Sequence, residues 1–258
     1  LYERSDDCRW WALTPELQVA LAEPHKSAES VARLTEILDY INSLYTVYTR
    51  IFIYDSAGVI IASTDFKADG LEVVGTSIDS TTLENVAMLR SDQQYYVTPF
   101  ENTALYGERP TYVYHAAIRH PEHTAQMVGG IGIVFDSEPE FSAMLKGALG
   151  DKDDVSALFI NRSGRIISST DPTRPVGDVL EIAPELLTME NGSSTSRIVI
   201  HDGHYAILGC TVSHGYREFK TSDGYREDVL AVVYKSFGEE RQKLNNGNNV
   251  DTCLLYTS

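Results

Sequence analysis

Two separate stretches of the chain share one pattern of apolar and polar positions without a gap. Residues 52–65 read Phe-Ile-Tyr-Asp-Ser-Ala-Gly-Val-Ile-Ile-Ala-Ser-Thr-Asp, and residues 158–171 read Leu-Phe-Ile-Asn-Arg-Ser-Gly-Arg-Ile-Ile-Ser-Ser-Thr-Asp. In each copy an apolar run reaches a polar turn, where Gly58 or Gly164 can adopt positive φ, and a β-branched run follows. Each copy predicts a β-hairpin, so the chain is expected to contain two tandem copies of one unit.

The beginning of the chain predicts mainly helix. A first helix is expected at Thr14 and Pro15, because threonine is a good N-cap and proline suits the first helical position, and Pro24 ends it. From Ser27 to Thr49 apolar residues recur every three or four positions, which predicts a long helix with one apolar stripe. We expect this stripe to pack on another helix or on a sheet.

Further strands and short helices complete each copy of the unit. In the first copy a helix, two strands and a glycine-rich strand are expected at 81–90, 94–100, 111–118 and 128–136. A connecting helix and then a helix, a hairpin and a final strand are expected at 138–149, 183–189, 197–209 and 228–234. Strands that follow one another with few crossover helices favour antiparallel sheets with helices on one face. The expected fold class is α+β, with a long N-terminal helix followed by two units, each an antiparallel sheet with flanking helices.

This plan divides the chain into five parts. They are an N-terminal helical segment, a first unit, a connecting helix with a linker, a second unit and a tail, at 1–49, 50–137, 138–154, 155–237 and 238–258. Within the second unit, residues 214–227 contain Gly-Tyr-Arg-Glu twice, and we expect a self-packed loop there. Residues 253–258 resemble the translation of an adapter used in library sequencing, and we expect them to be an artefact.

Composition and charge narrow the classes of partner. The 258 residues are 43% apolar, which indicates a folded protein with room for two domains. The formal net charge of −16 argues against nucleic acid and anionic lipid, because both need a basic surface. No apolar run approaches the roughly 20 residues that span a bilayer. Cys8 and Cys210 are expected to be buried thiols, since their spacing does not support a disulfide.

The order of these parts resembles the double Cache sensor domain of bacterial chemotaxis receptors and sensor kinases. That family has a long N-terminal helix and two PAS-like units, each with a hairpin of this form, a Val-Gly pair, a short helix and three antiparallel strands. Here Val-Gly pairs follow the two hairpins at Val74 and Val176, and the resemblance covers residues 27–237. It implies that the first unit binds a small molecule and that the second passes the change to a C-terminal signalling domain.

Many amino-acid-sensing members of this family carry Arg-x-Trp-Tyr on the short helix of the first unit and an aspartate at the end of its last strand. Asp136 matches the aspartate, whereas residues 80–90 contain no such motif. The resemblance therefore implies a ligand but leaves its class unknown.

The residues themselves suggest where a ligand could bind. Tyr112 and Tyr114 share one face of a predicted strand, and Gly130 and Asp136 share one face of the next strand. If these faces coincide, two phenols and a carboxylate line a cavity above the glycine, suited to a small polar or cationic ligand. The alternative is that the tyrosines are ordinary strand residues and that Asp136 caps the next helix. The candidate ligand-binding residues are Tyr112, Tyr114 and Asp136, with Tyr96, Arg90 and Arg109 as weaker candidates.

Signatures of catalysis, cofactors and metals were also sought. The sequence has no serine-hydrolase elbow, no phosphate-binding glycine loop, no zinc-protease motif and no evident Cys and His pair. His120 with His123, and His201 with His204, have a spacing that could bind a metal, but neither pair has the further ligands that complete a site. We expect no catalytic residues, no cofactor and no metal.

These observations favour a small-molecule-sensing input module of a bacterial chemotaxis or signal-transduction receptor, in which a population shift of the helix at 27–49 carries the signal. A protein-docking module and an uncharacterised enzyme are the alternatives. The expected partners are a small ligand, a C-terminal signalling domain and a second copy of the chain bound through the N-terminal helix. The resemblance implies the extracytoplasmic face of the bacterial inner membrane, with the cytoplasm as the alternative.

Overall fold

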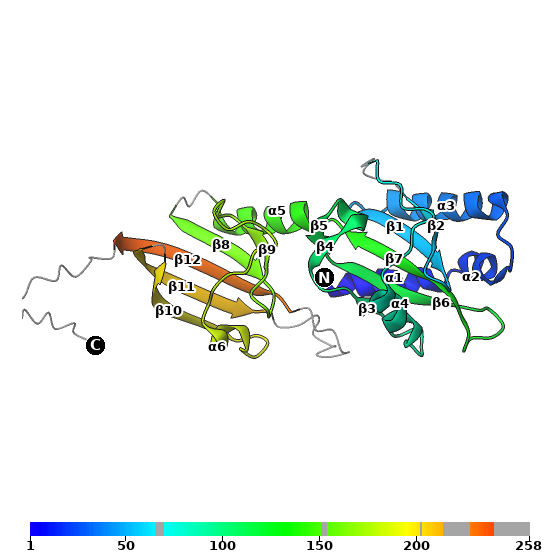
Figure 1. Ribbon diagram of the computed structural model, residues 1–258. Helices are drawn as coiled ribbons and strands as arrows, with labels where there is room; N and C mark the ends of the chain where they lie inside the picture. Colours follow the sequence, from blue (N-terminus) through cyan, green and yellow to red (C-terminus); the bar gives the residue numbers. More distant parts are fainter. Residues whose placement is uncertain (65–69, 151–153, 202, 214–227, 240–258) are drawn as a thin grey trace, which may run out of the picture.

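The computed structural model describes residues 1–64, 70–150, 154–201, 203–213 and 228–239, which form two five-stranded antiparallel sheets (Figure 1). The first sheet has the spatial order β2 (Ile60–Ser63), β1 (Tyr48–Asp55), β7 (Met127–Phe135), β6 (Val113–Arg119) and β3 (Tyr96–Val97). The second has the order β10 (Ser194–His201), β11 (His204–Val212), β12 (Leu230–Glu239), β8 (Val155–Ile160) and β9 (Ile166–Ser169). The α+β class with antiparallel sheets is confirmed. The doubled Gly-Tyr-Arg-Glu and most of the tail lie outside the described residues.

Both predicted hairpins form, and they use the same turn chemistry. The side chains of Asp55 and Asn161 each accept hydrogen bonds from the backbone amides two and four residues later, at 2.9–3.0 Å. Gly58 and Gly164 then reverse the chain with φ of 84° and 79°. A positive φ is costly for any residue with a Cβ, which is why glycine occupies this position in both copies.

The N-terminal part has one helix more than the two that were expected, and the expected long helix is shorter. It folds as three helices, α1 (Tyr2–Ala12), α2 (Pro15–Ala22) and α3 (Ala28–Ser43). Ser27 caps α3, as its hydroxyl accepts from the amide of Ser30, but the helix ends at Ser43 and strand β1 begins at Tyr48. The apolar residues near Tyr48 therefore belong to a strand and not to the end of a long helix.

The two faces of the first sheet are covered differently. Helices α1, α2 and α3 pack on one face, where Leu34, Leu38 and Ile131 are buried with Ile51 and Ile53 of β1. The opposite face carries Phe52 and the short helix α4 (Ser80–Ala87). Beside α4 lies a ribbon that was not predicted, made of β4 (Glu101–Thr103), the 3₁₀ turn η1 (Ala104–Tyr106) and β5 (Arg109–Thr111). Helices therefore lie on both faces of this sheet, not on one.

Helix α5 (Ser137–Leu149) connects the two units through aromatic contacts. Phe141 on α5 meets Phe135 of the first sheet with ring centroids 5.7 Å apart, and Phe159 of the second sheet at 5.8 Å. Ile167 belongs to the buried cluster on the helix-covered face of the first sheet, and the partly buried Phe159 packs against that cluster. The first-unit core thus continues through α5 onto the second sheet.

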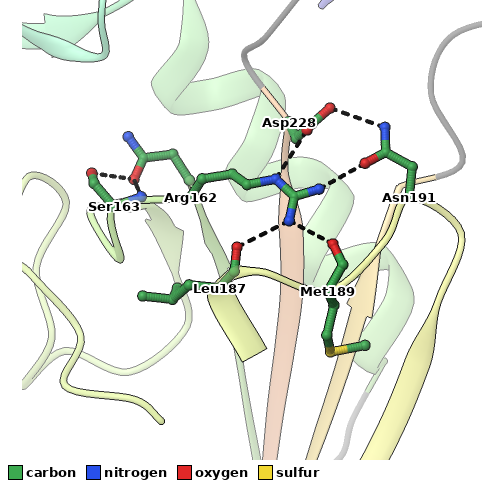
Figure 2. Close-up of polar contacts among 7 residues, drawn as sticks. Arg162, Ser163, Leu187, Met189, Asn191 and Asp228 are labelled. Atoms are coloured by element: carbon green, nitrogen blue, oxygen red, sulfur yellow. Dashed lines mark hydrogen bonds and ion pairs between the residues drawn. The ribbon is translucent and has the colours of Figure 1, made fainter. Parts of the chain in front are cut away.

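The second unit has its own core, closed by the short helix α6 (Pro184–Leu187) and by Arg162 (Figure 2). Arg162 donates to the carbonyl oxygens of Leu187 and Met189, at 2.9 and 2.6 Å, where the end of α6 leaves acceptors without helical partners. The same guanidinium reaches Asn191 at 2.7 Å and Asp228 at 3.0 Å. One side chain therefore joins the hairpin turn, α6 and the start of the last strand.

The other face of the second sheet exposes large apolar side chains over β10, β11 and β12, namely Ile198, Ile200, Tyr205, Ile207 and Phe237. Cys8 and Cys210 are both buried free thiols, as expected. Within the described ranges, no helix combines the length and apolar character needed to cross a membrane.

Candidate functional site

A cavity of about 550 Å³ opens on the α4 side of the first sheet. Its walls are the segment before α4, between Leu71 and Asp79, and the ribbon between Glu101 and Glu108. Its floor includes His115 of β6. We call this space the first-unit cavity. Its volume lies in the range of small-molecule binding sites in proteins.

His115 is the most deeply buried ionisable group in the lining of this cavity. It is 1% exposed and lies against the rings of Phe52, Tyr54 and Tyr96, with centroids 5.8, 5.8 and 6.3 Å away. Its Nδ1 is 3.3 Å from the hydroxyl of Tyr54. Burial lowers the pKa of His115 to about 3, a shift that the negative charge of Asp79 opposes. The imidazole is therefore neutral at neutral pH.

The cavity walls are acidic. Glu72 and Asp79 come from one wall, and Glu101 and Glu108 from the other. Asp79 also caps α4, because its carboxylate accepts from the amide of Thr82 at 2.9 Å. Among the lining residues in the described part of the chain there is no Lys and no Arg.

A buried arginine and an unusual backbone conformation shape these walls. Arg50 is 1% exposed and donates to the carbonyl oxygens of Thr64 and Leu71, at 3.4 and 3.2 Å, which anchors the segment that enters the first wall. In the ribbon, Glu108 has a φ of 58°, beside Gly107 at 66°. A non-glycine residue with this φ carries strain, and such residues occur preferentially at functional sites.

The ribbon is joined to α5 by two polar contacts. The hydroxyl of Tyr106 donates to Asp136 at 2.7 Å, immediately before α5 begins. Arg109 lies over the Tyr106 ring, 4.0 Å from its centroid, and pairs with Glu138 in the first turn of α5 at 2.6 Å. Burial and the bond to Asp136 raise the pKa of the Tyr106 phenol, so this hydroxyl acts as a hydrogen-bond donor. One wall of the cavity is thus tied to the helix that contacts the second unit.

No family model and no curated protein sequence matches this chain. Solved structures do match its fold. An extracellular ligand binding receptor from Desulfohalobium retbaense DSM5692 aligns over 90% of this chain with a TM-score of 0.60 and 9% identity, and this chain spans 38% of that chain's length. The sensor domain of the V. cholerae histidine kinase DctB aligns with a TM-score of 0.57 and 14% identity, over 91% of this chain and 89% of that one. The chain has the double Cache sensor fold.

A third structure with this sensor fold contains a ligand. It is the ligand binding domain of the Pseudomonas aeruginosa PAO1 amino acid chemoreceptor PctC in complex with GABA. The TM-score is 0.52 at 13% identity, over 88% of this chain and 89% of that one. The resemblance inferred from the hairpins and Val-Gly pairs is therefore confirmed at the level of the fold.

The face that carries Tyr112 and Tyr114 does not coincide with the face that carries the glycines. Tyr114 pairs with Ile133 and His115 with Gly132, so Tyr114 belongs to the helix-covered face, whereas His115 shares the cavity face with Gly132. Tyr112 is also buried in the helix-covered cluster, against Phe100 at 5.1 Å.

The space above the glycines is also filled. Side chains of Phe52 and Tyr54 lie where a Cβ on Gly132 or Gly130 would stand. These glycines therefore admit aromatic rings of the neighbouring strand and not a ligand.

The remaining candidates lie near the first-unit cavity or at the far end of the unit. Asp136 is buried and bonded to Tyr106, and Tyr96 lies against His115 behind the lining. Arg90 is exposed and lines a separate hollow of about 280 Å³ with Arg119. None of the six candidates, the three weaker ones included, is among the described residues that line the first-unit cavity, and direct ligand contact by them stays a prediction.

Proposed function

We propose that this chain is the small-molecule-sensing input module of a bacterial chemotaxis or signal-transduction receptor, and that its ligand binds in the first-unit cavity without chemical conversion. The observation that carries the proposal is the cavity itself, about 550 Å³ in volume, between α4, the ribbon and the sheet. Its polar walls and deeply buried His115 offer the combination of shape and placed polar groups that is typical of ligand sites.

The similarity to sensor domains supports the same proposal. The DctB domain belongs to a histidine kinase and the PctC domain to a chemoreceptor with bound GABA. By analogy with the extracellular receptor from Desulfohalobium retbaense, we place this module on the extracytoplasmic side of the membrane, with a signalling domain as its output.

A route for the signal follows from the contacts of the ribbon. A ligand that preferred one position of the ribbon would shift the population of that position. The ribbon contacts α5 through the bonds of Tyr106 and Arg109, and α5 contacts the second sheet through Phe141 and Phe159. Helix α3 covers the opposite face of the sheet, so we propose that the signal travels through α5 rather than through the helix at 27–49.

A thermal-shift screen of the chain against amino acids, organic acids, amines, purines and sugars tests the proposal. A ligand present at a hundred times its dissociation constant should add about 2.7 kcal/mol to the unfolding free energy, which gives a clear rise in melting temperature. Every hit is repeated on Ala104→Trp, which places a large ring on the cavity wall, and on Ala87→Trp, an exposed position of α4 outside the lining.

We expect a hit that is lost in Ala104→Trp and kept in Ala87→Trp. A hit that both variants keep would place the binding site elsewhere and contradict the proposal. If no compound shifts the melting temperature, the protein-docking alternative gains instead, and if a compound binds and is converted, the enzyme alternative does.

A further inference from the structure

The charge of the first-unit cavity restricts the chemistry of its ligand. Four carboxylates line it, Glu72 and Asp79 on one wall and Glu101 and Glu108 on the other. The described lining contains no Lys or Arg that could balance them. All four carboxylate residues are exposed at the cavity walls. An anionic ligand would meet like charges on both walls, which disfavours its binding.

The basic groups near the cavity do not neutralise its four carboxylates. His115 on the floor is held neutral by burial, so it offers no positive charge to a carboxylate. Arg50, whose guanidinium is bonded to Ser63, Thr64 and Leu71, is not among the described lining residues. Arg109 pairs with Glu138 on the outer side of the ribbon. The cavity therefore favours a positively charged ligand.

The lining residues also indicate which type of ammonium group the ligand carries. Quaternary ammonium groups are recognised mainly by aromatic faces, and the described lining contains no Phe, Tyr or Trp. Primary ammonium groups instead donate charge-assisted hydrogen bonds to carboxylates. Because carboxylates lie on both walls, a ligand with an ammonium group at each end can pair with both of them.

We propose that the first-unit cavity binds a small aliphatic diamine, with one ammonium group against Asp79 and Glu72 and the other against Glu101 and Glu108. This inference rests on the proposed sensing function and adds the ligand class to it. Buried His115 is the second observation that supports a ligand here, because its ring is 1% exposed, lines the cavity and has one nitrogen bonded to Tyr54. Within the described residues the other ring nitrogen of His115 makes no hydrogen bond.

Three compounds with the same four-carbon chain test the charge preference. They are 1,4-diaminobutane, GABA and succinate, and their binding to the full chain is measured by isothermal titration calorimetry at low and high salt. Asp79→Asn removes the charge but keeps an N-cap for α4, because asparagine caps helices as well as aspartate does. Glu101→Gln tests the opposite wall, and Glu84→Gln is the control, an exposed carboxylate of α4 outside the cavity.

We expect the diamine to bind tightest and succinate weakest. Binding of the diamine should weaken at least tenfold in Asp79→Asn and in Glu101→Gln, stay unchanged in Glu84→Gln, and weaken as salt rises. Tighter binding of GABA or succinate, lost in Ala104→Trp, would overturn the ligand class and leave the sensing function in place. Diamine binding that neither Asp79→Asn nor Glu101→Gln weakens would also overturn the ligand class. If none of the three compounds binds and the screen gives no hit, both the ligand class and the sensing function are overturned.

Discussion

The ring of Phe52 occupies the place that a Cβ on Gly132 would need. These two residues face each other across β1 and β7, and Tyr54 stands over Gly130 in the same way. The glycines of β7 therefore let an aromatic layer lie flat on the sheet beneath the first-unit cavity. The cavity begins above that layer, at His115 and the two acidic walls.

Replacing Gly132 with alanine should destabilise the protein. The new methyl group must displace Phe52 from a tightly packed core, which we expect to cost about 1–3 kcal/mol of unfolding free energy. Gly209→Ala on β11 is the matched control, because nothing lies within 4 Å of a Cβ there. Urea unfolding of both variants checks this, and an equal effect on the two would show that Phe52 does not restrict position 132.

The stability of the protein should depend on pH through His115. Its folded pKa of about 3 lies below the usual histidine pKa of 6.5, so between these values the unfolded chain binds the additional proton. His115 therefore favours folding fully above pH 6.5, and this contribution is lost as the pH falls toward 3. From pH 7 to pH 5 we expect the unfolding free energy to fall by about 2 kcal/mol through this residue.

Urea unfolding of the parent and of His115→Asn at the two pH values isolates this effect. The asparagine can keep a polar atom near the position of Nδ1. Any loss of unfolding free energy that the substitution causes equally at both pH values cancels when the two values are subtracted. The parent should lose about 2 kcal/mol more than the variant on acidification. Equal losses would mean that the buried imidazole is not held neutral.

Tyr106→Phe should weaken the junction between the ribbon and α5. The change removes a 2.7 Å hydrogen bond to the buried Asp136, and a bond to a charged group contributes about 1.5–3 kcal/mol. Tyr40→Phe, on an exposed ring of α3, should change stability by less than about 0.5 kcal/mol. Denaturant midpoints of the two variants provide the comparison, and a Tyr106→Phe protein as stable as Tyr40→Phe would refute the role of this bond.

Arg162→Ala should destabilise the second unit more than Arg197→Ala does. Arg162 bonds to four separate groups of this unit (Figure 2), so its loss should cost about 1–3 kcal/mol. Arg197 makes an ion pair with the exposed Glu185, and exposed ion pairs contribute little to stability. Circular dichroism during urea unfolding measures both, and the reverse order of stability would contradict the contacts in Figure 2.

Local chemistry explains what the sequence could predict of the fold. The hairpins were predictable because Asp55 and Asn161 bond to their own turns and glycine supplies the positive φ. Helix α1 was not predicted because part of the face that packs on the sheet is polar. Arg9 on this helix is buried and donates a 2.7 Å hydrogen bond to the carbonyl of Gln93. The ribbon was missed because Gly107 and Pro110 interrupt any alternating pattern.

The position of the site could not be predicted from the sequence of a single strand. Alternation along β6 and the residue before it separates Tyr112 and Tyr114 from Val113 and His115, but it does not show which pair faces the helices. That choice follows from the pairing with β7 and from the position of α1, whose Cys8 donates to the carbonyl of Tyr114. Asp79 and the ribbon carboxylates meet only in the folded chain, so no spacing in the sequence marks them as a group.

The most direct test of the account is calorimetric titration of the best compound from the screen into the parent chain, Ala104→Trp and Ala87→Trp. The account predicts one binding site per chain, an affinity reduced at least tenfold in Ala104→Trp, and no change in Ala87→Trp. Equal affinity in all three proteins, or binding that survives only in Ala104→Trp, would contradict a ligand site in the first-unit cavity.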